Sequence, residues 1–336
     1  MNAIHSAGRR NFLKKALTGV AAVGIGSGMG MLAAAEPGTA RTKSRVVIAR
    51  DALLRGTGSS VDESRMLTLL DRAMQVFFER DRPAEVWRML VRPGESVGLK
   101  VNALGGRGIS TNLQLVEAIC ERLREAGIRA SDIVVWDRDT DELEHAGFRL
   151  SIGGSLIQCY GTDQVGFEDQ LVMHGSVGSR LSKILTQRSN VLINLPVLKD
   201  HDGAGVTIGM KNMYGIIHNP NKYHPNGCDP FIADLNMLPE IRTRLRLTIC
   251  DATTAMYEGG PGYKPEYSWK HNALLLSQDP VALDYTGWQI IERKRASMGL
   301  KTLEAEKRAP SYIATAADAA HRLGTNDPKK ITTVEV

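Results

Sequence analysis

The sequence predicts an α/β fold, in which a mainly parallel sheet carries helices on both faces. Short runs such as residues 132–137 and 190–195 are dominated by apolar residues, which is typical of strands buried on both faces. Between such runs, apolar residues recur at helical spacing. Residues 96–137 contain a strand, a glycine-rich loop, a helix and a second strand, which is the order of a βαβ unit.

The first half of the predicted domain is built around this unit. A first strand is expected at residues 45–49, followed by a helix that Ser60 or Asp62 caps. The helix is expected to bury Met66, Leu69, Leu70, Ala73, Met74 and Phe77. A second strand is expected at residues 96–101, a helix at about 112–126 that ends at Gly127, and a third strand at 132–137.

The second half is expected to continue the alternation. Short elements near residues 155–160 and 171–174 and a helix at about 179–188 precede the strand at 190–195. Further strands are expected at 245–250, with Asp251 at the strand tip, and at 273–277. Asp279 and Pro280 have the cap and first-turn chemistry of a helix start. Residues 307–336 are expected to form a helix and a short closing segment.

The first 35 residues have the features of an export signal. An Arg-Arg pair at residues 9–10 precedes an apolar run rich in glycine and alanine that ends at Ala35. This pattern resembles a twin-arginine signal peptide, whose partner during export is the twin-arginine translocase. We expect cleavage near Ala35 and a periplasmic or otherwise exported protein. A flexible lead is expected at 36–44, then one α/β domain at 45–336, either a single unit or two lobes around a cleft.

The basic charge of the chain is concentrated in this signal. The whole chain has 42 Lys and Arg against 37 Asp and Glu. Residues 1–35 contain four of the basic residues and none of the acidic ones, so the mature chain has 38 against 37. This balance gives no reason to expect nucleic acid as a partner. Five glycines in the apolar run argue against a stable membrane span there. No membrane span is expected in the mature chain.

The four cysteines do not form a recognisable metal or cluster motif. Cys120, Cys159, Cys228 and Cys250 are widely spaced, and no CxxC pair occurs, so the chain has no iron–sulfur cluster motif. An exported protein can form disulfides. Four cysteines allow three pairings, and the sequence selects none of them.

Residues 190–230 contain the polar residues that predict a functional site. Lysines, histidines and asparagines alternate there with Val, Ile and Met, and an unpaired buried charge costs on the order of several kcal/mol. Lys199 is suited to bind an anion, form an imine or be modified, and His201 to transfer protons or bind a metal. A structural role is the alternative for each. The catalytic candidates are Lys199, His201, Lys211 and His218.

A second polar group is expected where parallel strands end, because ligands of open α/β sheets bind outside the carboxyl ends of the strands. Lys100 and Arg107 are suited to hold a carboxylate or phosphate there. A solvated turn with ordinary surface cations is the alternative, and the glycines between them do not form a GxGxxG motif. The candidate substrate-binding residues are Lys100, Asn102, Arg107, Asn194 and Asn212.

Three carboxylates and a histidine are the candidate metal ligands. An acidic stretch from Asp137 to residue 144 offers the oxygens that Mg²⁺ or Ca²⁺ prefers, and the alternative is the charged first turn of a helix. Asp284 lies in an otherwise apolar helix, where it either faces a polar cavity or caps a buried loop. The candidates are Asp137, Asp251, Asp284 and His224, although no HExxH zinc motif is present. The cofactor stays open, with a metal ion as one option.

Several of these motifs together resemble the domain-of-unknown-function 362 family. They are KVN at residues 100–102, NLPVLKDH at 194–201, VTIGMKNMYG at 206–215, GGP at 259–261 and DPVALD at 279–284. The resemblance runs from about residue 46 to residue 291. The family has no general assigned activity, so the resemblance indicates a family without naming a reaction.

The resemblance also has implications for cofactors and partners. Members of the family often carry a ferredoxin-like module, and since this chain lacks CxxC, electron transfer would need a separate redox partner. The family is distantly similar to the amino-terminal domain of lactate racemase, whose nickel-pincer nucleotide is bound through a lysine with a histidine on the metal. Lys199 and His201 invite that comparison, but no motif matches residue by residue, so the cofactor is not carried over.

The expected function is that of an exported enzyme that binds a small anionic organic molecule with a metal or preloaded cofactor. Lys100, Lys199 and Lys211 would hold the anion, and His201 or His218 would transfer protons. Hydrolysis by a serine triad is not expected, because no GxSxG elbow occurs. The alternative is a periplasmic binding or accessory protein that delivers a metal or assists a redox partner.

Overall fold

A mainly parallel sheet runs through the computed structural model, as predicted. The structure describes residues 43–336, so the expected signal peptide and residues 36–42 of the expected lead lie outside the described residues. The main strands are β1 (Ser44–Arg50), β2 (Val97–Lys100), β3 (Ile133–Trp136), β4 (Gln158–Cys159), β7 (Val191–Asn194), β10 (Leu245–Met256), β12 (Ala273–Ser277) and β13 (Ile331–Glu335). Their order is β13-β1-β12-β10-β7-β2-β3-β4. Neighbours are parallel except at β12, which runs antiparallel to β1 and β10.

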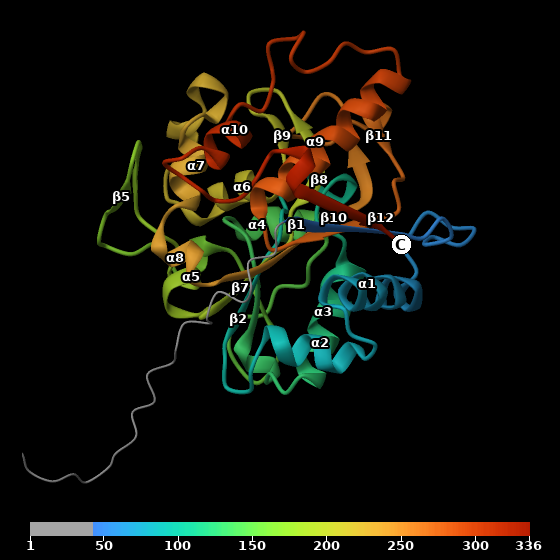
Figure 1. Cartoon of the computed structure of the whole chain (residues 1–336). Helices are drawn as coiled ribbons and strands as arrows, with labels where there is room; N and C mark the ends of the chain where they lie inside the picture. Colours follow the sequence, from blue (N-terminus) through green and yellow to red (C-terminus); the bar gives the residue numbers. More distant parts are fainter. Residues whose placement is uncertain (1–42) are drawn as a thin grey trace, which may run out of the picture. The chain divides into compact units, whose positions relative to one another are not determined.

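Helices cover both faces of the sheet, which confirms the predicted fold class (Figure 1). One face packs against α1 (Glu63–Phe78), α2 (Pro83–Leu90), α3 (Leu113–Glu125) and α4 (Thr140–Ala146). The other packs against α5 (Lys183–Gln187), α6 (Gly209–Asn212), α7 (Phe231–Asn236), α8 (Pro239–Arg242), α9 (Pro280–Ser297) and α10 (Tyr312–Ala317). Each face has its own apolar core because side chains alternate along a strand. In β1, Val46 and Ile48 join one core, and Val47 and Ala49 join the other.

Polar caps define the ends of the longer helices. Asp62 accepts a hydrogen bond from the N–H of Arg65 (2.9 Å) at the start of α1, and all six residues predicted for its buried face are buried. Asn112 caps α3, and Gly127, with a φ of 98°, follows its end. Asp279 accepts from the N–H of Ala282 (2.8 Å) before α9. These caps confirm the predicted helix starts.

The helix expected at about residues 179–188 is shorter than predicted. Residues Val177–Ser179 form strand β6, which pairs with β5 (Val172–His174) in a separate hairpin. Helix α5 begins only at Lys183, after Ser182, whose side chain accepts from the N–H of Ile184. The serine cap therefore sets the helix start later than the apolar pattern alone indicated.

The prediction that Asp251 marks a strand tip is wrong. Strand β10 continues to Met256, because its second half pairs with β8 (Val197–His201) and β11 (Ser268–Trp269). Asp251 therefore lies within a buried strand. Among the described residues, no helix is both long and apolar enough to cross a bilayer.

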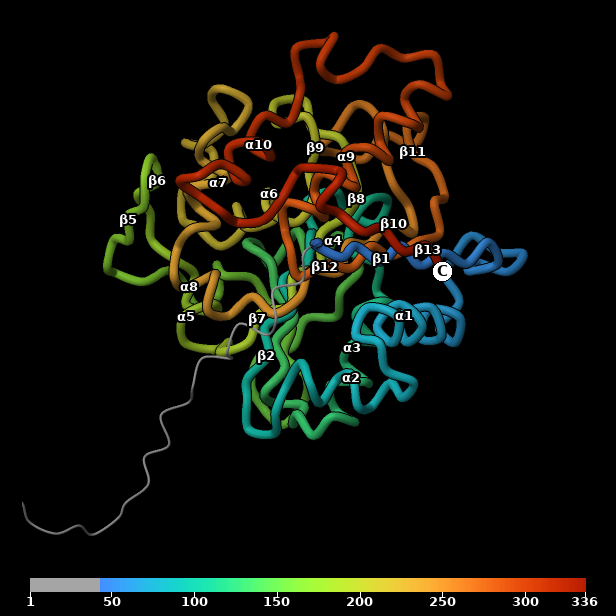
Figure 2. The backbone as a smooth tube through the Cα atoms, in the orientation of Figure 1, coloured from blue at the N-terminus to red at the C-terminus, as the bar shows by residue number. Residues whose placement is uncertain are grey.

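A hairpin beside the main strands carries Lys199 and His201, two of the predicted catalytic residues. Strand β8 turns into β9 (Gly205–Thr207), and helix α6 follows directly (Figure 2). Lys199 pairs in register with Thr207, so their side chains lie on the same face of the hairpin. Because side chains alternate along β8, Lys199 and His201 share that face and Asp200 lies on the other.

Candidate functional site

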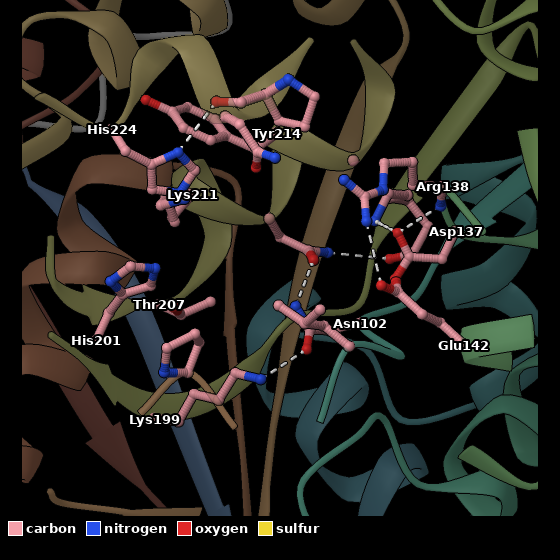
Figure 3. Close-up of a pocket in the computed structure, with 17 residues that line it drawn as sticks. Asn102, Asp137, Arg138, Glu142, Lys199, His201, Thr207, Lys211, Tyr214 and His224 are labelled. Carbon is pink, nitrogen blue, oxygen red and sulfur yellow. Dashed lines mark hydrogen bonds and ion pairs between the residues drawn. The ribbon is translucent and has the colours of Figure 1, made fainter. Parts of the chain in front are cut away.

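A cavity of about 260 Å³ lies at the carboxyl ends of β2 and β3. Lys100 ends β2, Asp137 follows β3, and the remaining wall comes mainly from the β8–β9 hairpin, α6 and the turns after it. In Figure 3, Asp137 and Arg138 lie on one side of the cavity, and His201, Lys211 and His224 lie on the other. Open α/β sheets bind their ligands at this edge.

Lys100 and Asp137 form a buried ion pair in one wall. The Lys100 Nζ lies 2.6 Å from Asp137 Oδ1 and donates to the carbonyl of Val101 at 2.7 Å. Asp137 also accepts from the N–H groups of Ala103 (2.8 Å) and Arg138 (2.7 Å). Each charge in this pair is therefore compensated within the protein.

Two further features surround this pair. Arg138 and Glu142 form a second ion pair in the wall, with 3.2 Å between Nη2 and Oε1. Gly215 packs against the first pair: a Cβ there would lie 2.7 Å from Lys100 Nζ and 2.7 Å from Asp137 Oδ1. A larger residue at this position would displace the pair, so the close approach requires glycine.

Lys199 is a buried cation without a carboxylate partner in the part of the chain that the structure describes. Its side chain is 0% exposed, and its Nζ donates one hydrogen bond, to Asn102 Oδ1 at 3.0 Å. Burial lowers the pKa of Lys199 to about 8. A lysine ammonium has three protons to donate, so Lys199 retains donor capacity toward the cavity.

Three asparagine amides hold the partner of Lys199 in place. Asn102 Nδ2 donates to Asn212 Oδ1 (3.0 Å), Asn212 Nδ2 to Asn194 Oδ1 (2.8 Å), and Asn194 Nδ2 to the carbonyl of Gly209 (2.9 Å). This series of hydrogen bonds directs the Asn102 oxygen toward Lys199. Asn102 and Asn212 line the cavity, whereas Asn194 supports them from behind the wall.

Lys211 is the second buried cation, with 6% of its surface exposed. Its Nζ lies 3.2 Å from His224 Nε2 and 3.8 Å from the centre of the Tyr214 ring. Burial lowers the pKa of Lys211 to about 8. His224 Nδ1 lies 3.1 Å from the carbonyl of Pro220 and donates to it, so Nε2 is the acceptor for Lys211.

His201 is a neutral imidazole in the wall. Its Nδ1 accepts from the N–H groups of Gly203 (3.1 Å) and Ala204 (3.2 Å), so the ring proton is on Nε2. Burial, with the nearby Lys211 charge, lowers the pKa of His201 to about 3. Asp202 Oδ1 lies 3.0 Å from Nδ1, but that nitrogen carries no proton, so the contact is not an ion pair.

Thr207 adds a hydroxyl that the sequence did not single out. Its Oγ1 is buried and has no hydrogen-bond partner among the described residues, and the side chain lines the cavity. Buried polar groups usually have a hydrogen-bond partner, so this hydroxyl is available to a water molecule or a ligand in the cavity. The pairing of Lys199 with Thr207 in register brings this hydroxyl to the lysine, and only the strand pairing reveals it.

The charges of the wall leave an excess of two positive groups. Its cations are Lys100, Arg138, Lys199 and Lys211, and its carboxylates are Asp137 and Glu142. Both carboxylates are paired with the first two of these cations. The other two cations, together with the Thr207 hydroxyl and the His201 N–H, form a set of donors suited to an anion.

A known protein family matches the part of the chain that forms the cavity. A family model described as "Domain of unknown function (DUF362)" matches residues 97–289. The chain belongs to the DUF362 family. All residues that line the cavity fall within the matched range, so the cavity belongs to the DUF362 region itself. No curated protein matches the chain.

Two predicted site residues of this DUF362 protein, His218 and Arg107, are exposed at the surface away from the cavity. His218 is exposed, and its ring packs edge-on against Phe167, with 5.2 Å between ring centres. Arg107 is also exposed and borders a different surface groove together with Arg55. The turns that follow α6 and β2 direct these side chains outward, so neither contributes to the cavity wall.

Asp251 and Asp284 bind backbone groups rather than facing the cavity. Asp251 accepts from the N–H groups of Asn112 (2.6 Å) and Thr253 (2.8 Å), which joins β10 to the start of α3. Asp284 accepts from the N–H of Gly209 (2.7 Å) and of Met210, where α6 begins, and from the Tyr312 hydroxyl (3.0 Å). Burial raises the pKa of both carboxyls, that of Asp284 to about 7.

The four predicted metal ligands are not gathered around one point. Asp137 binds Lys100, His224 binds Lys211, and the other two aspartates cap backbone segments. Within residues 43–336, no group of three or more His, Cys, Asp or Glu is placed to hold a metal ion. All four cysteines are buried free thiols.

Asp200, which the sequence did not single out, supports the cavity from the opposite face of β8. It is fully buried, and burial raises its pKa to about 6. Its carboxylate accepts from the N–H of Gly260 (2.9 Å) and pairs with Arg308 (3.3 Å). Because Gly260 precedes Pro261, which lines the cavity, Asp200 positions one edge of the wall.

Proposed function

We propose that this DUF362 protein is an exported enzyme that binds a small organic anion in the cavity. The observation that carries the proposal is the presence of two buried lysines, Lys199 and Lys211, without carboxylate partners in the described chain. A buried cation that no protein group neutralises is destabilising unless a ligand neutralises it. The unsatisfied Thr207 hydroxyl supports the same site.

The lowered pKa values of both lysines favour an enzyme over a binding or accessory protein. A group that titrates near pH 8 both holds an anion and exchanges a proton close to neutral pH. His201, with a pKa of about 3, is suited to donate a hydrogen bond from Nε2 rather than to act as a base.

The proposal assigns no metal ligand to the described chain, because Asp137 and His224 are engaged by lysines. A preloaded cofactor with a carboxylate or phosphate group would use the same lysines as the anion site. The Arg9-Arg10 pair and the apolar run that follows it support the proposed periplasmic location, because they resemble a twin-arginine signal.

Titration calorimetry with small carboxylates and phosphate tests the anion site. We expect the Lys199→Met variant to bind at least about tenfold more weakly than the wild type, which corresponds to about 1.4 kcal/mol. Lys330→Met is the matched control, because Lys330 is exposed and outside the cavity wall. Equal affinities in both variants, or no anion binding in the wild type, would show that the cavity is not an anion site.

A further inference from the structure

Lys211 and His224 have an arrangement that anion binding alone does not explain. The hydrogen-bond partner of Lys211 Nζ is an imidazole nitrogen, His224 Nε2 at 3.2 Å, rather than a carboxylate or a carbonyl. The opposite imidazole nitrogen is held by the carbonyl of Pro220, so the free lone pair is directed at the lysine. The lysine nitrogen therefore lies beside a group that can accept its proton.

The surroundings of Lys211 also favour an uncharged amine as a reactive state. The Tyr214 ring covers one side of Nζ at 3.8 Å, and the side chain is largely removed from water. The aromatic face stabilises the ammonium form. Burial favours the amine and lowers the pKa of Lys211. Buried lysines of this kind are the ones that form imines with carbonyl compounds.

Lys199 has a different environment, which separates the roles of the two lysines. Its partner is the amide oxygen of Asn102, which accepts a hydrogen bond but does not take a proton. The asparagine chain fixes that oxygen, and Thr207 lies opposite Lys199 on the neighbouring strand. Lys199 is therefore suited to hold a carboxylate, whereas Lys211 is suited to attack a carbon.

We propose that Lys211 forms an imine with the carbonyl carbon of a small oxo acid, whose carboxylate is held by Lys199 and Thr207. This inference rests on the proposed anion site and names its substrate class. Because the cavity of about 260 Å³ lies below the usual range for drug-sized ligands, the acid has only a few carbons.

The proposed step balances without a cofactor. His224 Nε2 takes a proton from the Lys211 ammonium, and the free amine attacks the carbonyl carbon, forming a C–N bond. A proton moves from nitrogen to the former carbonyl oxygen, which gives a carbinolamine. His224 then returns its proton to the hydroxyl, the C–O bond breaks, and water leaves. The products are one protonated imine and one water molecule.

Reductive trapping tests this inference. The full mature chain is incubated with pyruvate and sodium borohydride, and intact mass and peptide mapping locate any adduct. We expect a mass increase equal to that of pyruvic acid less one oxygen atom, located on Lys211. The Lys211→Arg variant keeps a positive charge but should give less than about a tenth of the adduct. The His224→Gln variant should form the adduct more slowly, and Lys330→Arg is the control.

Calorimetry with lactate, which has no reducible carbonyl, separates this inference from the anion site. Binding of lactate and pyruvate without trapping would overturn the imine and leave the anion site standing. An adduct mapped to Lys199 or to surface lysines would also overturn the assignment. Absence of binding for both acids would count against the proposed function. Near-identical melting temperatures for Lys211→Arg and the wild type would show that a lost adduct reflects chemistry rather than unfolding.

Discussion

At the scale of single residues, the cavity depends on two buried lysines for which residues 43–336 supply no carboxylate partner. Burial lowers the pKa of Lys199 and of Lys211 to about 8, so the charged form of each opposes folding at neutral pH. Polar groups that reduce stability in this way are frequent in sites that bind or react. The free energy of unfolding should therefore reveal the cost of Lys199 directly.

We expect Lys199→Met to raise the free energy of unfolding at pH 7 by about 1–3 kcal/mol. The methionine side chain is similar in volume to lysine, and the substitution removes the buried charge. Between pH 8 and the ordinary lysine pKa of 10.5, the unfolded chain holds a proton that folded Lys199 has lost. The wild type should therefore gain stability relative to the variant as pH rises through this window. Urea unfolding at pH 7, 8.5 and 10 measures the difference, and a variant less stable than the wild type at every pH would contradict it.

Residue types and strand ends were sufficient to predict much of the cavity wall. Lys199, His201, Lys211 and Lys100 were all predicted from polar residues in apolar surroundings, and all line the cavity. Thr207 was missed because an isolated threonine in a strand carries no signal until the strand pairing is known.

In the structure, Asp251 and Asp284 accept hydrogen bonds from backbone N–H groups, which is an alternative to the metal-binding role predicted for them. A buried aspartate that accepts backbone N–H groups and one that binds a metal look alike in sequence, because both are acidic residues in apolar surroundings. The N–H groups that these two carboxylates accept come from residues distant in the chain. Only the tertiary structure therefore distinguishes the two roles.

At the scale of elements, the short helix α6 and the turn after it place Lys211 and Asn212 in the wall. Asp284 of α9 accepts the first N–H groups of α6. Gly215, in the following turn, packs directly on the Lys100–Asp137 pair. The apolar strands at residues 190–195 and 273–277 were predictable from composition. The hairpin and α6 were not predicted as separate elements, because each is too short for a periodic pattern to develop.

We expect Gly215→Ala to destabilise the protein by about 1–3 kcal/mol, since the added methyl group overlaps two buried charged atoms. Displacement of Lys100 should also weaken anion binding in calorimetry. Gly262→Ala is a suitable control, because a Cβ at Gly262 meets no atom within 4 Å and its φ is not in the left-handed region. Equal unfolding free energies for the two variants would contradict the close packing at Gly215.

At the scale of the whole molecule, one sheet with two cores brings distant segments to a single edge. Lys100 ends β2, Asp137 follows β3 and Lys199 lies in β8. The parallel pairing of β2 with β3 and β7 aligns the ends of these three strands at this edge. The α/β class and the covered faces were predictable from alternating apolar runs. The reversed direction of β12 within the sheet was not, because β12 is buried on both faces and has the same apolar run as the parallel strands.

The proposed export is a property of the whole chain and would depend on residues 1–35. We expect the wild type to accumulate in the periplasm of a Gram-negative host, with a mature chain that begins at Glu36. The double variant Arg9→Lys and Arg10→Lys should remain in the cytoplasm, because the translocase recognises the arginine pair. Cell fractionation and intact mass measure both outcomes. Periplasmic accumulation of the double variant would contradict export by this route.

The central claim, that two lysines with lowered pKa values bind an anion, is tested most directly by proton-linked calorimetry. Succinate, which does not titrate near pH 8 and has no ketone, is titrated into the protein at pH 8 in two buffers of different ionisation enthalpy. An anion beside Lys199 and Lys211 favours their ammonium forms, so we predict uptake of up to about one proton per succinate bound. Uptake should fall by about half in Lys199→Met. Binding without proton uptake, or no binding, would contradict the claim.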